Sequence, residues 1–381
     1  MKALILTLLI SLGSFTIFAQ DHPGRLMFVD IKGHSGSHIY TGDALTEFLE
    51  YGYGAAEIRL GWQTDGRNDL EHDYNFPYFG VGWYSGAIGS PEILGQPNAI
   101  YGFFGFPVGK HKRNSFNPEL ALGLTYDLVN YDPEDNPYND AIGARMAVYF
   151  NLNFGFNYAL NREIDLIYGI DFTHFSNGRT FQPNYGLNMM GINLGARYHF
   201  NTGQKKYSPG IRPEKVLPVR ADYTRIKKSK KLFNENNILV TTGFGTSQNL
   251  ADAGTDNRYF NFSGILDYQH FFSIKHGFTA GLDFFHDGSM EPLGDDPNML
   301  AGHLGYDFRF WDLTLRLQMG SYISAPERRM GTIFMRPAVK YDLFERIYAQ
   351  VGLKTLNGAA ADWIEFGFGY QIVHRRKERK K

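Results

Sequence analysis

His174, Ser176 and Asn188 have the residue types and the spacing of a hydrolytic triad. A serine hydroxyl becomes a good nucleophile when a neighbouring imidazole takes its proton, and a third polar group orients that imidazole. In this arrangement Ser176 attacks, His174 acts as general base and then as general acid, and the Asn188 amide holds the ring. The predicted chemistry is hydrolysis of an ester, which needs no metal or other cofactor.

The turn after Ser176 supplies candidates for stabilising the oxyanion of such a reaction. They are the side chain of Asn177 and the backbone N–H groups of Asn177 and Gly178. A histidine and a serine two positions apart also occur in the polar girdles of inactive barrels. From spacing alone, a channel, an adhesin or a structural barrel therefore remains an alternative.

The segments around these residues alternate between apolar and polar positions with a period of two, which is typical of β-strands. His174 and Ser176 share the face of Ile170, and Asn188 on the returning strand shares the face of Met190. We therefore expect all three polar side chains to face outward at one hairpin, in a register that places Asn188 beside His174. Polar groups that face hydrocarbon are unfavourable unless they bond one another, so their presence indicates function.

The composition favours a membrane barrel. The 381 residues include 24 Tyr, 32 Phe and 43 Gly, no Cys, and a net charge of −1 that gives no general affinity for nucleic acid. After the first segment, no apolar run is long enough for a transmembrane helix. Alternating segments of about ten residues, with no helices to cover their apolar face, predict an all-β fold, an antiparallel transmembrane outer-membrane β-barrel.

The alternation predicts sixteen strands. The first eight lie near residues 26–33, 52–64, 78–86, 97–108, 117–129, 144–158, 164–176 and 186–200, and the second eight near 237–247, 259–272, 276–286, 298–310, 312–322, 332–342, 346–355 and 362–373. Eight strands are enough to close a small barrel. The second eight would either enlarge it to about sixteen strands or form a second barrel. Because one chain with two membrane barrels is unusual, we expect one larger barrel.

The chain divides into segments of different composition. Residues 1–19 resemble a signal peptide and predict export to the outer membrane. Residues 20–200 carry the hairpin with the candidate site, 201–235 form a polar basic linker, 236–373 carry the further strands, and 374–381 form a basic tail. With both ends of the barrel in the periplasm, the strand count places the turn after Ser176 at the outer surface.

The stretch "THFSNGRTFQPNYGLNMMGINLGARYHF" resembles the signature of the outer-membrane lipid A 3-O-deacylase family. Upstream, "GVGWYSGAIGSPEILGQPNAIYGFFGFP" resembles the larger, acyloxyacyl-hydrolase-like members, and the resemblance covers about residues 24–200. It implies a bilayer-embedded enzyme that removes the 3-O-linked acyl chain of lipid A, the lipid part of lipopolysaccharide. It also implies His174 as the base, Ser176 as the nucleophile and Asn177 as an oxyanion donor, while Arg179 is placed to bind lipid A phosphate.

One departure from the family pattern lies at Asn188. The family has a glutamate fourteen residues after the histidine, and this chain has Asn188 there. The amide puts the rate or the exact reaction in doubt, because a Ser–His–Asn set is similar to the site of outer-membrane phospholipase A, a calcium-dependent dimeric family. The segment "FQPNYGL" replaces the calcium-binding segment of that family. Candidate calcium ligands are Asp132, Glu134, Asp135 and Asp140.

Two further patterns leave alternatives open. His34 and His38 in "GHSGSH" are expected near an outer loop, as metal ligands or as ordinary interface residues. The stretch "AGLDFFHDGSM" at 280–290 resembles "YGIDFTHFSNG" at 168–178, with His286 matching His174 and Gly288 in place of Ser176. The two stretches are either copies of a duplicated hairpin or similar by chance. The oligomeric state is not indicated by the sequence.

Overall fold

The computed structural model describes residues 26–40, 42–47, 49, 52–64, 71, 73–108, 113–161, 163–200, 234–326, 331–357 and 360–375. The predicted signal peptide, most of the predicted linker 201–235 and most of the tail 374–381 lie outside the described residues.

The first half of the chain forms a closed barrel in which β8 pairs with β1. Its strands are β1 (Leu26–Tyr40), β2 (Gly52–Gln63), β3 (Tyr78–Ala87), β4 (Gly95–Gly105), β5 (Asn114–Leu128), β6 (Ala147–Ala159), β7 (Ile164–Ser176) and β8 (Leu187–His199). Each strand is antiparallel to its neighbours, so every backbone ladder is satisfied within the sheet. Two short helices, α2 (Asp43–Thr46) and α4 (Pro91–Leu94), lie in its connections.

The second half closes separately, with β16 paired to β9. Its strands are β9 (Glu235–Ser247), β10 (Tyr259–Phe271), β11 (His276–Asp287), β12 (Asn298–Phe310), β13 (Leu313–Ser324), β14 (Ile333–Asp342), β15 (Ile347–Leu356) and β16 (Ala360–Arg375). Two 3₁₀ helices, η3 (Leu250–Asp252) and η4 (Gly288–Leu293), lie in its connections.

The expectation of one larger barrel is therefore wrong: the chain forms two closed barrels of eight strands each. A single barrel would need β8 to pair with β9, whereas Phe28 of β1 lies opposite His199 of β8. The period of two predicts where strands lie and which face is apolar. It is the same for one barrel of sixteen strands and for two barrels of eight, so it does not distinguish them.

Both barrels are apolar outside and polar inside. Ile192 and Leu304 on the outer faces are 65% and 71% exposed, whereas Arg197 and Arg316 inside are 2% and 1% exposed. An apolar outer belt is suited to lipid and would be unfavourable in water. No helix in the described part of the chain has the length and apolarity to cross a membrane.

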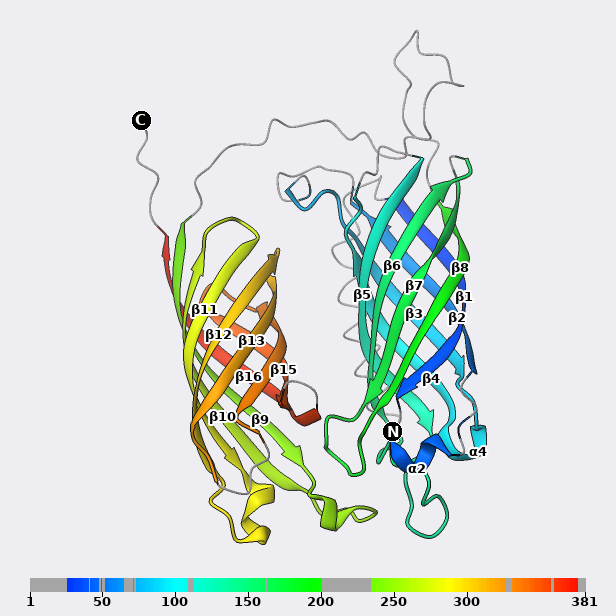
Figure 1. Cartoon of the computed structure of the whole chain (residues 1–381). Helices are drawn as coiled ribbons and strands as arrows, with labels where there is room; N and C mark the ends of the chain where they lie inside the picture. The colour runs from blue at the N-terminus through cyan, green and yellow to red at the C-terminus, as the bar shows by residue number, and fades with distance from the viewer. Residues whose placement is uncertain are drawn as a thin grey trace, which may run out of the picture.

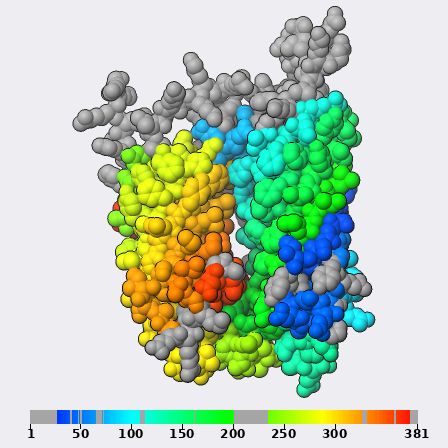
Figure 2. Space-filling model, viewed as in Figure 1, coloured from blue at the N-terminus to red at the C-terminus, as the bar shows by residue number. Residues whose placement is uncertain are grey.

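The two barrels stand side by side with their strands running in similar directions (Figure 1). At the end where β8 and β16 finish, aromatic rings join the barrels: Phe310 lies 5.0 Å from Tyr74 and 5.7 Å from Phe104, between ring centroids. At the opposite end, the connection between β7 and β8 contacts the second barrel. Figure 2 shows a narrow opening between the barrels at mid-height.

Candidate active site

His174 and Asn188 lie opposite each other on β7 and β8, in the register expected from the sequence. The Nδ1 atom of His174 is 2.8 Å from the Oδ1 atom of Asn188. The amide oxygen accepts a hydrogen bond, so this contact places the ring proton on Nδ1 and leaves the Nε2 lone pair available. The ring also stacks on Phe172, with 6.3 Å between centroids and 10° between planes. The orientation of the imidazole is thus fixed by one polar and one apolar neighbour.

Gly186 lies against the Cε1 edge of the histidine ring. It has φ +76°, and a Cβ atom built on it would lie 2.9 Å from Cε1 of His174. Glycine adopts this left-handed conformation freely and leaves room for the ring, whereas another residue would be strained and would collide. The backbone N–H of Gly186 donates to the carbonyl of Ala141, which holds the residue against the ring.

Ser176 is the last residue of β7, and its hydroxyl is bonded to the turn that follows. The Oγ atom is 3.2 Å from Oδ1 and 3.0 Å from Nδ2 of Asn184, and the backbone N–H of Gly178 donates to it at 3.2 Å. The side chain is 6% exposed. None of the hydrogen bonds described for these residues joins Ser176 to His174. The strand places both side chains on the outward face, but the hydroxyl is directed to Asn184.

Asn177 is buried beside the serine, and its side-chain amide has no hydrogen-bond partner among the described residues. Its backbone N–H donates to Oδ1 of Asn184 at 3.0 Å. The backbone N–H groups of Asn177 and Gly178 already have acceptors, whereas Nδ2 of Asn177 remains available as a donor beside the serine. A buried unpaired amide is unfavourable by itself, which indicates a role outside the resting structure.

Arg179 points away from Ser176 and toward the second barrel. Its Nη2 atom is 3.1 Å from Oδ2 of Asp287 and 3.0 Å from Oδ1 of Asp362. Its Nε–H donates to the carbonyl of Asp362 at 2.7 Å. The predicted contact of Arg179 with lipid A phosphate stays a prediction, and the charge of the guanidinium is balanced in this structure by two carboxylates.

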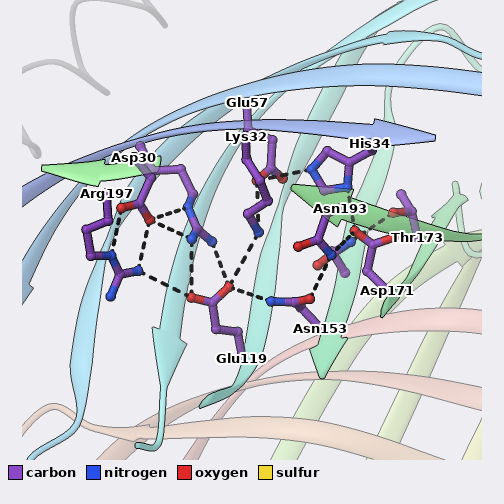
Figure 3. Close-up of polar contacts among 12 residues, drawn as sticks. Asp30, Lys32, His34, Glu57, Glu119, Asn153, Asp171, Thr173, Asn193 and Arg197 are labelled. Atoms are coloured by element: carbon purple, nitrogen blue, oxygen red, sulfur yellow. Dashed lines mark hydrogen bonds and ion pairs between the residues drawn. The ribbon is translucent and has the colours of Figure 1, made fainter. Parts of the chain in front are cut away.

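Behind the hairpin, a network of ion pairs and hydrogen bonds fills part of the barrel interior (Figure 3). On β7, Asp171 bonds His34 and accepts from Asn193 at 3.1 Å, and Thr173 accepts from Asn151 at 2.8 Å. These inward contacts alternate along the strand with the outward His174. Toward the end where β7 finishes, the interior is filled by an apolar cluster that includes Tyr84, Tyr101, Tyr149, Phe175, Leu187 and Met189.

The expectation that His34 lies near a loop is corrected by the longer extent of β1, whereas His38 does contact a loop, the connection between β3 and β4. His34 is buried in the interior between Asp171 and Glu57, and His38 bonds the carbonyl of Ile88 at 2.6 Å. The strand continues to Tyr40 because the alternation persists through the small residues of "GHSGSH". Both histidines therefore have structural partners.

The acidic loop residues named as calcium candidates do not converge. Asp132 accepts the N–H groups of Glu134 and Asp135, and these bonds lower the pKa of its carboxyl group. Asp140 accepts the N–H groups of Ala44 and Leu45 in helix α2, and burial raises its pKa. In the part of the chain that the structure describes, no group of three or more His, Asp or Glu side chains is arranged to hold a metal ion.

Sequence reasoning assigned no role to Asn184 and Gly186. Both lie within the quoted stretch "FQPNYGL", which is part of the longer stretch that resembles the family signature. Their functions depend on how the turn folds back: Asn184 returns to the serine and Gly186 to the histidine. A glycine between two polar strand ends is a recognisable signal for a close backbone approach, but it does not name the side chain approached.

Two family models match the chain. The model described as "Lipid A 3-O-deacylase (PagL)" matches residues 56–197, and "Acyloxyacyl hydrolase, C-terminal domain" matches residues 236–375. No curated protein matches the sequence significantly.

Among solved structures, Neisserial surface protein A is similar at 14% identity and a TM-score of 0.32, over 46% of this chain and 97% of that one. A mutant Rh. blastica porin is similar at 11% identity and a TM-score of 0.20, over 91% and 99%. Likenesses this low carry no argument about function. The first model covers the first barrel from within β2 to β8, including the hairpin from His174 to Asn188, and the second model covers the second barrel. On this evidence the chain belongs to the lipid A 3-O-deacylase (PagL) family, with the acyloxyacyl hydrolase C-terminal domain as its second barrel.

Proposed function

We propose that this chain is an outer-membrane lipid esterase that hydrolyses an ester-linked acyl chain of lipid A with Ser176, His174 and Asn188. The observation that carries the proposal is the 2.8 Å contact between His174 and Asn188 on the outward face, two residues before the rim where Ser176 lies. Membership of the lipid A 3-O-deacylase family supports the substrate.

The reaction begins with a change of rotamer at Ser176. Residues two apart on a strand lie about 7 Å from each other, so the hydroxyl reaches Nε2 of His174 by turning away from Asn184 and toward the histidine. Catalytic hydrogen bonds are often absent or long before substrate binds. His174 then takes the hydroxyl proton on Nε2, while Asn188 keeps the other ring proton on Nδ1.

The attack of Oγ on the ester carbonyl forms a C–O bond and places negative charge on the carbonyl oxygen. Nδ2 of Asn177 is the buried donor available to that oxygen. When the intermediate collapses, the C–O bond to the lipid A alcohol breaks and His174 returns its proton to that alcohol. Water then attacks the acyl-serine, with His174 again acting as base, and releases the fatty acid.

The filled interior of the first barrel argues against the channel alternative. Its ion-pair network includes Arg59, which is 2.8 Å from Glu119 and 2.6 Å from Asp30, with all three side chains buried. The apolar cluster that includes Tyr84 and Tyr149 occupies the interior behind the hairpin. A conducting barrel needs a water-filled lumen, and neither region of this interior provides one.

The experiment that tests the proposal compares lipid A from cells that produce the wild-type chain, Ser176→Ala or Ser321→Ala. Ser321 is an exposed serine on the second barrel and gives a matched control. Mass spectra are expected to show loss of one acyl chain with the wild type and with Ser321→Ala, and intact lipid A with Ser176→Ala. Intact lipid A in all three samples contradicts the proposal.

The same purified proteins, incubated with phosphatidylethanolamine vesicles, test the phospholipase alternative. We include phosphatidylethanolamine as a substrate because Asn188 has an amide where the deacylase pattern has a glutamate. We expect no calcium-dependent release of fatty acid. Release that requires Ser176, depends on calcium and exceeds the release from lipid A assigns the site to phospholipids instead.

A further inference from the structure

The turn that follows the proposed nucleophile is bound by the second barrel through the side chain of Arg179. The guanidinium lies between Asp287, at the end of β11, and Asp362, on β16. Both carboxylates are fully buried, and the arginine side chain is 15% exposed. An arginine held by two buried carboxylates and a backbone carbonyl is restricted in position more strongly than by one surface ion pair.

The backbone of the same turn is held as well. The N–H of Gln248 donates to the carbonyl of Arg179 at 3.0 Å, and the N–H of Gln182 donates to Oε1 of Gln248 at 2.7 Å. Gly178 lies against Ile364 of β16, where an added Cβ would be 2.4 Å from Cγ1. Arg179 has φ +63°, a conformation that a non-glycine residue keeps only where its surroundings fix it.

The carboxylates are themselves fixed by the second barrel. Asp287 accepts the N–H of Ser289 at 3.1 Å and its hydroxyl at 2.6 Å, which caps helix η4. Asp362 forms an ion pair with the buried Lys354. The acceptors for Arg179 are therefore positioned independently of the arginine, as in a preformed binding site.

The corner that supplies Asp287 has the geometry of the first hairpin without its nucleophile. His286 pairs with Asn298 across β11 and β12, as His174 pairs with Asn188, with 3.2 Å between Nδ1 and Oδ1. Gly288 takes the place of the serine, and a Cβ there would lie 2.6 Å from the carbonyl oxygen of Phe260. This corner cannot hold a serine without moving the backbone, and Asp287 and Ser289 contact Arg179 instead.

We propose that Asp287, Asp362 and Gln248 of the second barrel are positioning residues that hold the turn between Ser176 and Asn184 in its reactive conformation. The proposal rests on the proposed esterase function of the first barrel. In this proposal the second barrel supports catalysis by positioning the turn, and it contributes no group that reacts with the substrate. Arg179 is the link, since it follows directly on the proposed oxyanion residues.

The first test is a double-mutant cycle of Arg179→Ala and Asp287→Asn on the full chain, with Glu291→Gln as control. Glu291 lies in the same helix η4 and is solvent-exposed, so the control removes an equal charge that does not touch Arg179. We expect each cycle variant to lower kcat by about 100-fold with little change in KM, because a shift of about 1 Å in a catalytic group has such an effect. The double variant is expected to be no slower than Arg179→Ala.

The kinetic pattern separates positioning from phosphate binding by Arg179. If the arginine bound lipid A phosphate, Arg179→Ala would raise KM, and Asp287→Asn would free the guanidinium and lower KM. Either result overturns the proposal, as does wild-type kcat in Asp287→Asn. Electrophoretic mobility with and without heating verifies that each variant is folded, and partial rescue of kcat by Arg179→Lys is expected because the charge is retained.

The second test does not depend on activity. Because the chain has no cysteine, Thr180→Cys gives one attachment site for a nitroxide spin label in the turn. We expect the label to be more mobile in Asp287→Asn than in the parent or in Glu291→Gln. Unchanged mobility overturns the proposal. An inactive wild type with the expected change in mobility contradicts the esterase function and leaves the structural coupling in place.

Discussion

The hydrogen bond between His174 and Asn188 joins two paired strands on the lipid-facing side of the first barrel. It holds the ring proton on Nδ1 and leaves the Nε2 lone pair available to take a proton. In Asn188→Ala the ring loses this acceptor, and kcat is expected to fall by about 100-fold, the range typical of lost general-base catalysis. Asn188→Glu restores an acceptor of the family's type and is expected to equal or exceed the wild type. Steady-state release of fatty acid from lipid A measures both variants.

The matched control for this prediction is Asn298→Ala. Asn298 occupies the equivalent position beside His286 in the second barrel, so the corresponding hydrogen bond is removed from the equivalent strand pair. This variant is expected to keep the wild-type kcat. Equal losses in Asn188→Ala and Asn298→Ala would show that the effect is on barrel structure and not on the catalytic ring.

Substitution of Gly186 is expected to displace the imidazole ring of His174. In Gly186→Ala the new methyl group meets Cε1 of His174, and the ring must move by several tenths of an ångström or more. We expect kcat to fall by about 100-fold. Gly294→Ala is the control, because Gly294 has φ +78° and open space around it. Both variants carry the cost of a left-handed alanine, about 1–2 kcal/mol, so a difference in kcat isolates the contact with His174. Equal activity in the two variants contradicts the predicted role of Gly186.

The positions of the strands and the outward orientation of His174 and Asn188 could be predicted from the sequence, because both depend on local alternation of apolar and polar residues. The apolar residues at every second position from Ile164 to Phe172 predict the face of His174, and the connection 177–186 brings Asn188 back beside it. The closure into two barrels depends on which strand meets β1 and β9, and local patterns do not encode that choice.

The details of the site depend on contacts between distant residues and could not be predicted. The hydroxyl of Ser176 is directed to Asn184 by the folded turn, and nothing in the spacing selects that rotamer over one toward His174. The strand count places Arg179 in the turn at the outer surface, and this position predicts a contact with lipid A phosphate. Its carboxylate partners lie in the other barrel, with Asp287 108 positions away in the sequence.

Loss of the side-chain N–H donor of Asn177 is expected to destabilise the transition state. In Asn177→Asp the side chain keeps its size but loses the N–H donor, and its carboxylate repels the developing oxyanion. We expect kcat to fall by about 100- to 1,000-fold with KM little changed, as for other oxyanion donors. Asn177→Ala is expected to be similarly slow, since it also lacks the donor. Wild-type activity in Asn177→Asp assigns the oxyanion to another group.

Asp30 belongs to the interior network of Figure 3, and its substitution is expected to destabilise the first barrel. Its carboxylate is fully buried and binds two guanidinium groups, with 2.6 Å to Nη2 of Arg59 and 2.7 Å to Nε of Arg197. In Asp30→Asn both guanidinium groups lose this carboxylate and share Glu119, which also pairs with Lys32. The free energy of unfolding is expected to fall by about 3–5 kcal/mol, which urea titration in detergent or lipid measures. Asp256→Asn makes the same change on an exposed loop and is expected to leave the urea midpoint unchanged. A midpoint for Asp30→Asn equal to that of Asp256→Asn would mean that water solvates the arginines or that a neighbouring carboxylate balances them, and that the network contributes little to the stability of the barrel.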